Sequence, residues 1–281
     1  SAGELIARKI QLAFEKAVCR SKFGDDQEAL KIFNEIESRL FPSALDKTLI
    51  DLYTVKINNE RSFILVKNYE FKQALDLYKK SVAIIRNYRD SDDYGVALRG
   101  IAGILSINEN NNDSLKFLQE ARELFEKNFN INQKIITLKN ISKYYIRNGD
   151  VNEAMYYIDE CIRLLEIRED FQELPLFYSQ KAKIFLMQDN YVRAEEFFKK
   201  DLNLTKQTDN IHSLAFSYYH LGVAFQKQNL LGIAESHLKK SIEYFNIIDN
   251  INNKIPALLQ LAINNAKCGI PKLASKFIAE A

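Results

Sequence analysis

Residues that interrupt helices are scarce in this chain. Its 281 residues include nine Gly, four Pro and no Trp. Because Gly and Pro are the residues that most often break regular structure, their scarcity favours long helices. Hydrophobic residues make up 47% of the chain and charged residues 27%, a balance typical of a globular protein. The length exceeds the usual size of one domain, roughly 100 to 150 residues, and the composition favours a repeat array.

Cysteine and long apolar runs are also lacking. Cys19, Cys161 and Cys268 lie far apart and match no metal-ligand spacing, which predicts small buried thiols in a reducing compartment. No apolar run approaches the roughly 18 to 20 residues needed to cross a bilayer, and the N-terminus does not resemble a signal peptide. We therefore expect a cytoplasmic protein without a membrane partner. The chain opens with Ser1 and stops within a helical pattern at Glu280-Ala281, from which we expect a segment of something longer.

Neither charge sign is in clear excess. The chain has 39 Lys and Arg against 37 Asp and Glu, a net charge of +2, and the two signs are interleaved along the whole length. Nucleic acids require a concentrated positive surface. The even distribution argues against a nucleic-acid partner for this region.

Sequence motifs of known enzyme classes are missing as well. No HExxH, GxSxG, GxGxxG or Walker-type GxxxxGK[ST] occurs. His212 and His220 lie eight residues apart and His237 falls in a different expected helix, so the three match no metal or triad arrangement. The sequence therefore predicts a protein that is not an enzyme, with no catalytic residue, no metal site and no cofactor.

What the chain does contain is an internal repeat. A small residue that opens an amphipathic stretch returns every 40 residues, and an earlier copy lies 45 residues before the series. The extra residues predict an insertion around Phe41-Pro42-Ser43. These anchor positions are Ala29, Ala74, Ser114, Ala154, Ala194, Ala234 and Ala274. They predict seven units, at approximately 5–44, 45–93, 94–132, 133–172, 173–212, 213–252 and 253–281, the last one truncated.

Further positions repeat in phase with the anchor. Twelve residues before it, all seven units have a small residue: Ala17, Ser62, Ala102, Ser142, Ala182, Gly222 and Ala262. Seven residues after it come Ser81, Ala121, Cys161, Ser241 and Ala281. Each unit is expected to be a helix pair, the first helix carrying the small residue where its partner crosses closely. The second helix follows a polar turn such as Asn148-Gly149-Asp150 or Gln188-Asp189-Asn190. One pair cannot bury its apolar face alone, so the pairs must stack.

Small and large residues at fixed positions, with a Gly or Asp turn before the anchoring Ala, resemble the tetratricopeptide repeat. The resemblance covers nearly the whole chain, and segments 148–154 and 219–225 match it best. It implies an all-α, right-handed solenoid of about seven helix pairs. The 40-residue period is longer than the usual 34, and is similar to that of Rap-type and PlcR-type peptide-pheromone receptors and of long-repeat eukaryotic scaffolds.

The resemblance also implies that the first helix of each unit lines an inner, concave face. Positions fifteen, fourteen and eleven before the anchor should point toward a guest. The partner-binding residues expected there are Asn59, Phe63, Arg99, Gly103, Lys139, Asn140, Lys143, Gln180, Lys183, Tyr219 and His220. The one Arg and three Lys of this set would attract an acidic segment. The alternative is that these cations merely solvate the helix surface.

Three glycines, Gly95, Gly100 and Gly103, cluster in the first helix of the third unit. Each interior Gly costs a helix roughly 0.5 to 1 kcal/mol relative to Ala. Close packing of a neighbouring helix is one explanation, and close approach of a bound peptide or a hinge is the other.

Together these patterns predict a regulatory or adaptor module that binds a protein or peptide in its groove. A signalling-peptide receptor that controls transcription or a response regulator, and a structural scaffold of a multiprotein assembly, are the alternatives. The apolar face of residues 256–281 makes a homodimer through the C-terminal unit plausible.

Overall fold

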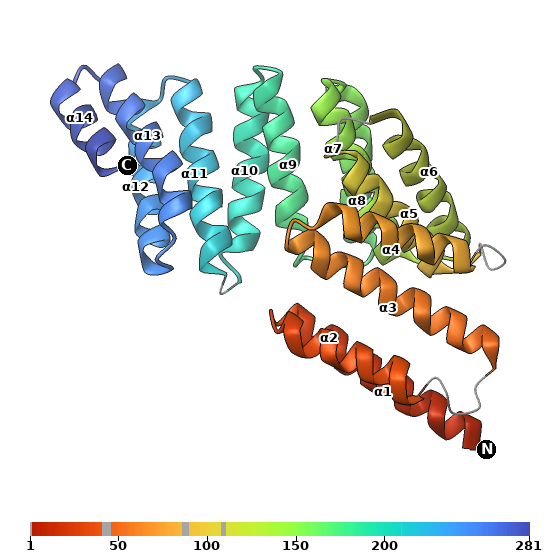
Figure 1. Ribbon diagram of the computed structural model, residues 1–281. Coiled ribbons are helices and arrows are strands. Elements are labelled where there is room, and N and C mark those ends of the chain that lie inside the picture. The colour runs from red at the N-terminus through yellow and green to blue at the C-terminus, as the bar shows by residue number, and fades with distance from the viewer. Residues whose placement is uncertain (1, 41–45, 86–89, 108–110, 209) are drawn as a thin grey trace. The chain divides into compact units, whose positions relative to one another are not determined.

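The computed structural model describes residues 2–40, 46–85, 90–107, 111–208 and 210–281 (Figure 1). In these residues the chain forms fourteen α-helices and no strand, which confirms the predicted all-α repeat fold. The predicted insertion at 41–43 lies outside the described residues.

The helices follow one another with short connections. Their bounds are α1 Ala2–Lys22, α2 Asp26–Glu35, α3 Lys47–Lys67, α4 Phe71–Ile84, α5 Asp92–Leu105, α6 Asn111–Lys127, α7 Ile131–Asn148, α8 Val151–Ile167, α9 Leu174–Met187, α10 Tyr191–Thr205, α11 Ile211–Lys227, α12 Leu231–Ile247, α13 Ile251–Lys267 and α14 Pro271–Glu280. A short π-helical segment, η1 Ile36–Leu40, extends α2.

The chain divides into two compact units, residues 1–144 and 145–281, with the boundary inside α7. In the first unit, α1 packs on α2, α3 on α4, and α5 on both α4 and α6. In the second unit, α9 packs on α10, α11 on both α10 and α12, and α13 on both α12 and α14. The second helices α4, α10 and α12 therefore each contact their own first helix and the first helix of the following pair, and this stacking buries the apolar faces.

The small repeat positions lie where the two helices of a pair cross. All seven anchors are buried, and so are all seven residues twelve positions earlier. At one crossing, a Cβ added to Gly222 would lie 2.7 Å from Leu238 Cγ and 3.3 Å from the carbonyl oxygen of the anchor Ala234. At another, the anchor Ser114 donates a hydrogen bond from its hydroxyl to the carbonyl of Ala102, at 2.8 Å. Close backbone approach explains why these positions are small, as predicted.

The turns between helices use a residue in the left-handed conformation. Gly149 has φ +82°, and the next residue, Asp150, donates its amide to the Tyr145 carbonyl at 2.9 Å, closing the end of α7. Asp189 takes the same conformation, and α8 and α10 begin directly after the two predicted polar turns. Bulky residues occupy the equivalent position elsewhere, as at Phe129, where φ is 55°.

One expectation about the cysteines is wrong. Cys161 is buried at a helix crossing, but Cys19 and Cys268 are exposed. Cys268 caps the C-terminus of α13, where the helix ends in solvent, and Cys19 lies in the penultimate turn of α1. Neither occupies a repeat position that the stacking buries.

Candidate functional site

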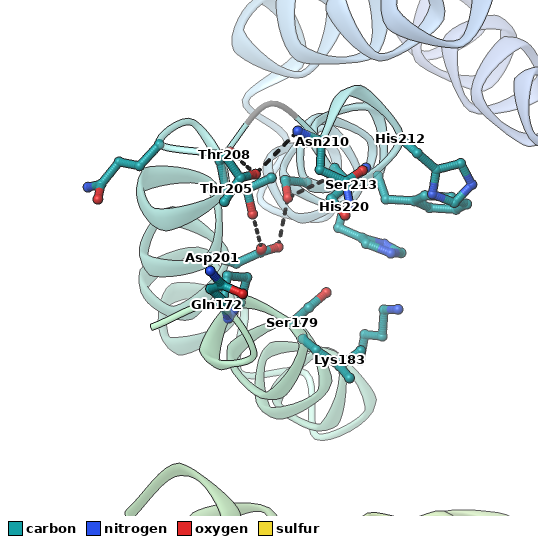
Figure 2. Close-up of a pocket in the computed structure, with 15 residues that line it drawn as sticks. Gln172, Ser179, Lys183, Asp201, Thr205, Thr208, Asn210, His212, Ser213 and His220 are labelled. Carbon is teal, nitrogen blue, oxygen red and sulfur yellow. Dashed lines mark hydrogen bonds between the residues drawn. The ribbon is translucent and has the colours of Figure 1, made fainter. Parts of the chain in front are cut away.

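Each unit contains a pocket lined mainly by first helices. The larger, the unit-2 pocket, has a volume of about 960 Å³ and is formed by α9, α10, α11 and the α10–α11 connection (Figure 2). Ser179 and Lys183 of α9 and His220 of α11 lie around the same hollow, with Asp201 of α10 between the two helices (Figure 2). The pocket thus combines side chains from both helices of one pair with the first helix of the next.

The floor of the unit-2 pocket is a buried polar cluster. Asp201 is only 4% exposed, and each of its carboxylate oxygens accepts one hydroxyl hydrogen bond. Thr205 Oγ1 donates to Asp201 Oδ1 at 3.0 Å, and Ser217 Oγ donates to Asp201 Oδ2 at 3.0 Å. Asn210 fixes the start of α11 by accepting the Ser213 amide at 2.9 Å. The hydrogen bonds from Thr205 and Ser217 hold the carboxylate in one orientation.

This cluster interrupts the apolar core of the repeat. Asp201 stands seven residues after its anchor, the position of the small residues Ser81, Ala121, Cys161 and Ser241. Thr205 stands four residues further on, where other units have large buried apolar residues: Ile85, Phe125, Leu165 and Phe245. A buried carboxylate costs folding free energy that a small or apolar residue would not. Both residues that depart from the repeat pattern, Asp201 and Thr205, line the unit-2 pocket.

Burial sets the charge behaviour of the cluster. Desolvation raises the pKa of Asp201 to about 6, although the hydroxyls of Thr205 and Ser217 and the charge of Lys183 act in the opposite direction. The protein around the Lys183 ammonium lowers the pKa of that group by desolvation, and Asp201 partly opposes this effect. No ion pair joins the two groups among the described residues, although both lie on the same hollow.

One wall of the unit-2 pocket is aromatic. The imidazole of His220 stacks on Phe198, with ring centroids 5.4 Å apart, and on Phe216, at 6.1 Å. Burial lowers the pKa of His220 to about 3, and the charge of Lys183 adds to this shift. The ring is therefore neutral at physiological pH and contributes an apolar surface with a single N–H donor.

The smaller pocket, the unit-1 pocket, measures about 590 Å³ and lies along the first helices α3, α5 and α7. Its lining includes five predicted binding residues: Asn59, Phe63, Arg99, Gly103 and Asn140. An added Cβ on Gly103 would meet no atom within 4 Å, whereas one on Gly100 would lie 2.3 Å from the Tyr78 ring. Close packing therefore accounts for Gly100, and Gly103 faces open space.

Arg99 shares the unit-1 pocket with two carboxylates. Its guanidinium donates to the side-chain and backbone oxygens of Gln133 and is 5.8 Å from the Phe125 ring. Burial lowers the pKa of Arg99 to about 10, and it raises the pKa values of Glu60 and Asp93. The surface around Arg99 is thus mixed in charge.

The structure distributes the predicted residues unevenly. Lys183 and His220 line the unit-2 pocket. Lys139 is half-buried and Lys143 exposed, and neither lines one of the two pockets. Gln180 is half-buried, and its Oε1 has no hydrogen-bond donor among the described residues. Tyr219 packs against the apolar cluster that joins α11 to α12 and α13.

The prediction missed the second-helix contribution to the unit-2 pocket. It considered only first helices, so Asp201 and Thr205 were not among the candidates. A signal was available in the sequence, because Asp201 is a charged residue at a position where the other units from the second to the sixth carry Ser, Ala or Cys.

The residues that the structure describes contain neither a cluster of metal ligands nor a helix that could span a membrane. No group of three or more His, Cys, Asp or Glu side chains lies close enough there to hold a metal ion. Within the same residues, every helix is too short or too polar to cross a membrane.

The fold and the first-helix pockets define a tetratricopeptide-like helical repeat protein. The family model described as soluble NSF attachment protein, SNAP, matches residues 54–253, more than two thirds of the chain. The chain therefore belongs to this family of helical repeat proteins. No curated protein matches its sequence.

Solved structures of the same fold extend over nearly the whole chain. A signal-transduction ATPase with a tetratricopeptide repeat sensor from Pyrococcus horikoshii aligns with a TM-score of 0.78 and 15% identity, over 99% of this chain and 43% of that one. RapI aligns with a TM-score of 0.71 and 14% identity, over 96% of this chain and 95% of that one. Aspartyl phosphate phosphatase F from Bacillus subtilis aligns with a TM-score of 0.69 and 13% identity, over 100% of this chain and 71% of that one. These likenesses confirm the predicted tetratricopeptide and Rap-type resemblance as one of fold.

Proposed function

We propose that the chain is a protein-interaction module that binds a peptide segment of its partner in the hollows formed by its first helices. The unit-2 pocket is the principal site. Its volume of about 960 Å³ falls in the range of ligand-binding pockets, roughly 300 to 1,000 Å³. The predicted residues Lys183 and His220 lie on its walls.

One observation carries this proposal. The cluster of Asp201, Thr205 and Ser217 replaces core residues at the base of an open pocket, at a cost in stability. Buried charged groups that weaken a fold are concentrated at functional sites, where binding or catalysis offsets their cost. The same positions in the neighbouring pairs are small or apolar and need no such compensation.

The comparisons support an interaction role. The matching family is described as an attachment protein, and in the Pyrococcus horikoshii protein the tetratricopeptide repeats are described as a sensor. Both descriptions fit a repeat surface that recognises another molecule. The unit-1 pocket, with Phe63, Arg99 and Asn140, would bind a second segment.

Selection from a random octapeptide display library tests the proposal. The wild-type protein should enrich a defined group of peptides. Ser179→Trp, which fills the unit-2 pocket from α9, should weaken their binding about tenfold or more. Met187→Trp serves as the matched control, because Met187 is an exposed residue of the same helix that does not line the pocket.

Gly103→Phe places a large side chain in the unit-1 pocket from a position where a Cβ meets no atom within 4 Å, and it reports on that hollow separately. Fluorescence anisotropy with labelled peptides gives the affinities, and far-UV circular dichroism verifies that each variant is folded. Failure to enrich any peptide, or equal affinity of the selected peptides for wild type, Ser179→Trp and Gly103→Phe, would refute the proposed function.

A further inference from the structure

We propose that the unit-2 pocket recognises a positively charged N–H donor group of the bound peptide, and that Asp201 is the residue that receives it. This inference rests on the proposed function and adds the chemistry of the guest. The cationic group comes from an arginine side chain, a lysine side chain or a free peptide N-terminus, which share the same donor chemistry.

The first argument is that Asp201 has unused acceptor capacity. An ionised carboxylate offers about four lone-pair sites. Thr205 uses one site on Oδ1 and Ser217 one on Oδ2, and no Lys, Arg or His of the described residues lies within ion-pair distance of either oxygen. Each oxygen therefore keeps a free site on a carboxylate that borders the pocket.

The second argument is energetic. Buried carboxylates are normally paired with a cation, because an unpaired charge in the protein interior is expensive. Asp201 is more than nine-tenths buried and has no cation bound to it. A guest that brings the missing positive charge gains a strong, charge-assisted hydrogen bond at a site already desolvated before binding. A guest that brings an anion would be repelled at the same place.

Lys183 does not supply the cation that Asp201 lacks. It lies across the hollow from the cluster and forms no hydrogen bond or ion pair with another described residue (Figure 2). A peptide carbonyl or carboxylate can accept from its ammonium while the cationic group of the same peptide reaches Asp201. The two charges then orient the guest, since the reversed orientation sets like charges against each other at both ends.

The aromatic wall suits the same group. Phe216 and His220 line the hollow beside the cluster, and their two rings stack on each other. A guanidinium or ammonium gains from contact with an aromatic face, and arginine also stacks on it.

Removing the positive charges of the bound peptide, one at a time, tests the inference directly. Peptides selected on the wild-type protein are resynthesised with each cationic group removed in turn: Arg replaced by citrulline, Lys by acetyl-lysine, or the N-terminus acetylated. We expect one of the three changes to weaken binding about tenfold or more, and the identity of that change names the source of the charge. Because the change is made on the peptide, the result does not depend on the folding of a variant.

Asp201→Asn then locates the effect. The peptide change that weakens binding to the wild-type protein should alter the affinity for this variant by less than about twofold. The reason is that the interaction between residue 201 and the cationic group of the peptide disappears when either of them is neutral. Asp150→Asn, at an exposed position of the same unit, should retain the full effect. Peptides that lose affinity in Ser179→Trp but tolerate all three neutralisations would overturn this inference and leave the proposed function standing. Peptides insensitive to Ser179→Trp and Gly103→Phe would overturn the proposed function itself.

Discussion

Replacing Asp201 with Asn should stabilise the protein at neutral pH and remove one component of its pH dependence. The pKa of Asp201 is about 6 in the folded protein against an ordinary value of 3.8. A difference of this size corresponds to roughly 3 kcal/mol between the two protonation states. Because Asp201 is 4% exposed, solvent screens this effect little. The variant is therefore expected to gain up to roughly 3 kcal/mol in its free energy of unfolding at pH 7.5.

The sign follows from proton binding. The folded state holds the Asp201 proton more tightly than the unfolded chain, so protonation stabilises the fold. That stabilisation is complete below pH 3.8 and is lost as the pH rises through about 6. Between pH 7.5 and pH 5 the wild-type protein should gain about 1.4 kcal/mol relative to Asp201→Asn. His220, with a pKa lowered to about 3, acts in the opposite direction, but it does so in both proteins and cancels in the difference.

Urea unfolding followed by far-UV circular dichroism at pH 5, 6 and 7.5 measures this difference. Asp150→Asn, at an exposed position, is the matched control. The difference between its free energy of unfolding and that of the wild-type protein should be the same at the three pH values. A titration of the carboxyl carbons of ¹³C-labelled aspartate gives the pKa of Asp201 directly, as the signal missing from the variant. If the stability difference between wild type and Asp201→Asn is the same at pH 5 and pH 7.5, the buried carboxylate does not behave as its surroundings imply.

Two further predictions concern the helices and turns. Gly103→Ala should raise the free energy of unfolding by about 1 kcal/mol, because the added Cβ meets no atom and Gly disfavours helix, whereas Gly100→Ala should lower it because its Cβ would collide with the Tyr78 ring. Equal effects of the two changes on the thermal midpoint would contradict the packing described for α5. Phe129→Gly should raise the free energy of unfolding by about 1 kcal/mol relative to Phe129→Ala, since this 89% exposed residue adopts φ 55°, a conformation that Gly takes without strain. No difference between these two variants in urea unfolding would show that the turn is not strained.

Repetition in the sequence was sufficient to predict the fold. The period of 40 residues, the small residues at Ala154 and Ser142, and the polar turn at Gly149 all reflect local requirements of a helix pair. A crossing point excludes a large side chain whatever surrounds it, and a turn needs a left-handed residue. Each repeat must meet these requirements, so the same residue types recur at the same positions in the seven units and the pattern can be recognised in the sequence.

The first-helix positions of the pockets were predictable for the same reason. Asn59, Arg99 and Asn140 occupy the expected positions, and all three line the unit-1 pocket. Lys139, the neighbour of Asn140, stands fifteen residues before its anchor as Asn59 and Arg99 do, yet it does not line that pocket. Whether such a neighbour faces a hollow depends on how far each helix is rotated against the next.

The chemistry of the unit-2 pocket was decided by tertiary structure. The sequence by itself determined that the chain is a stack of helix pairs, and that Asp201 departs from the repeat. Only the packing of α10 between α9 and α11 brings that carboxylate to Thr205 and Ser217, opposite Lys183 and beside His220. Burial, which shifts the pKa values of this site, arises from contacts between residues distant in the chain. A pattern that repeats along one helix cannot contain that information.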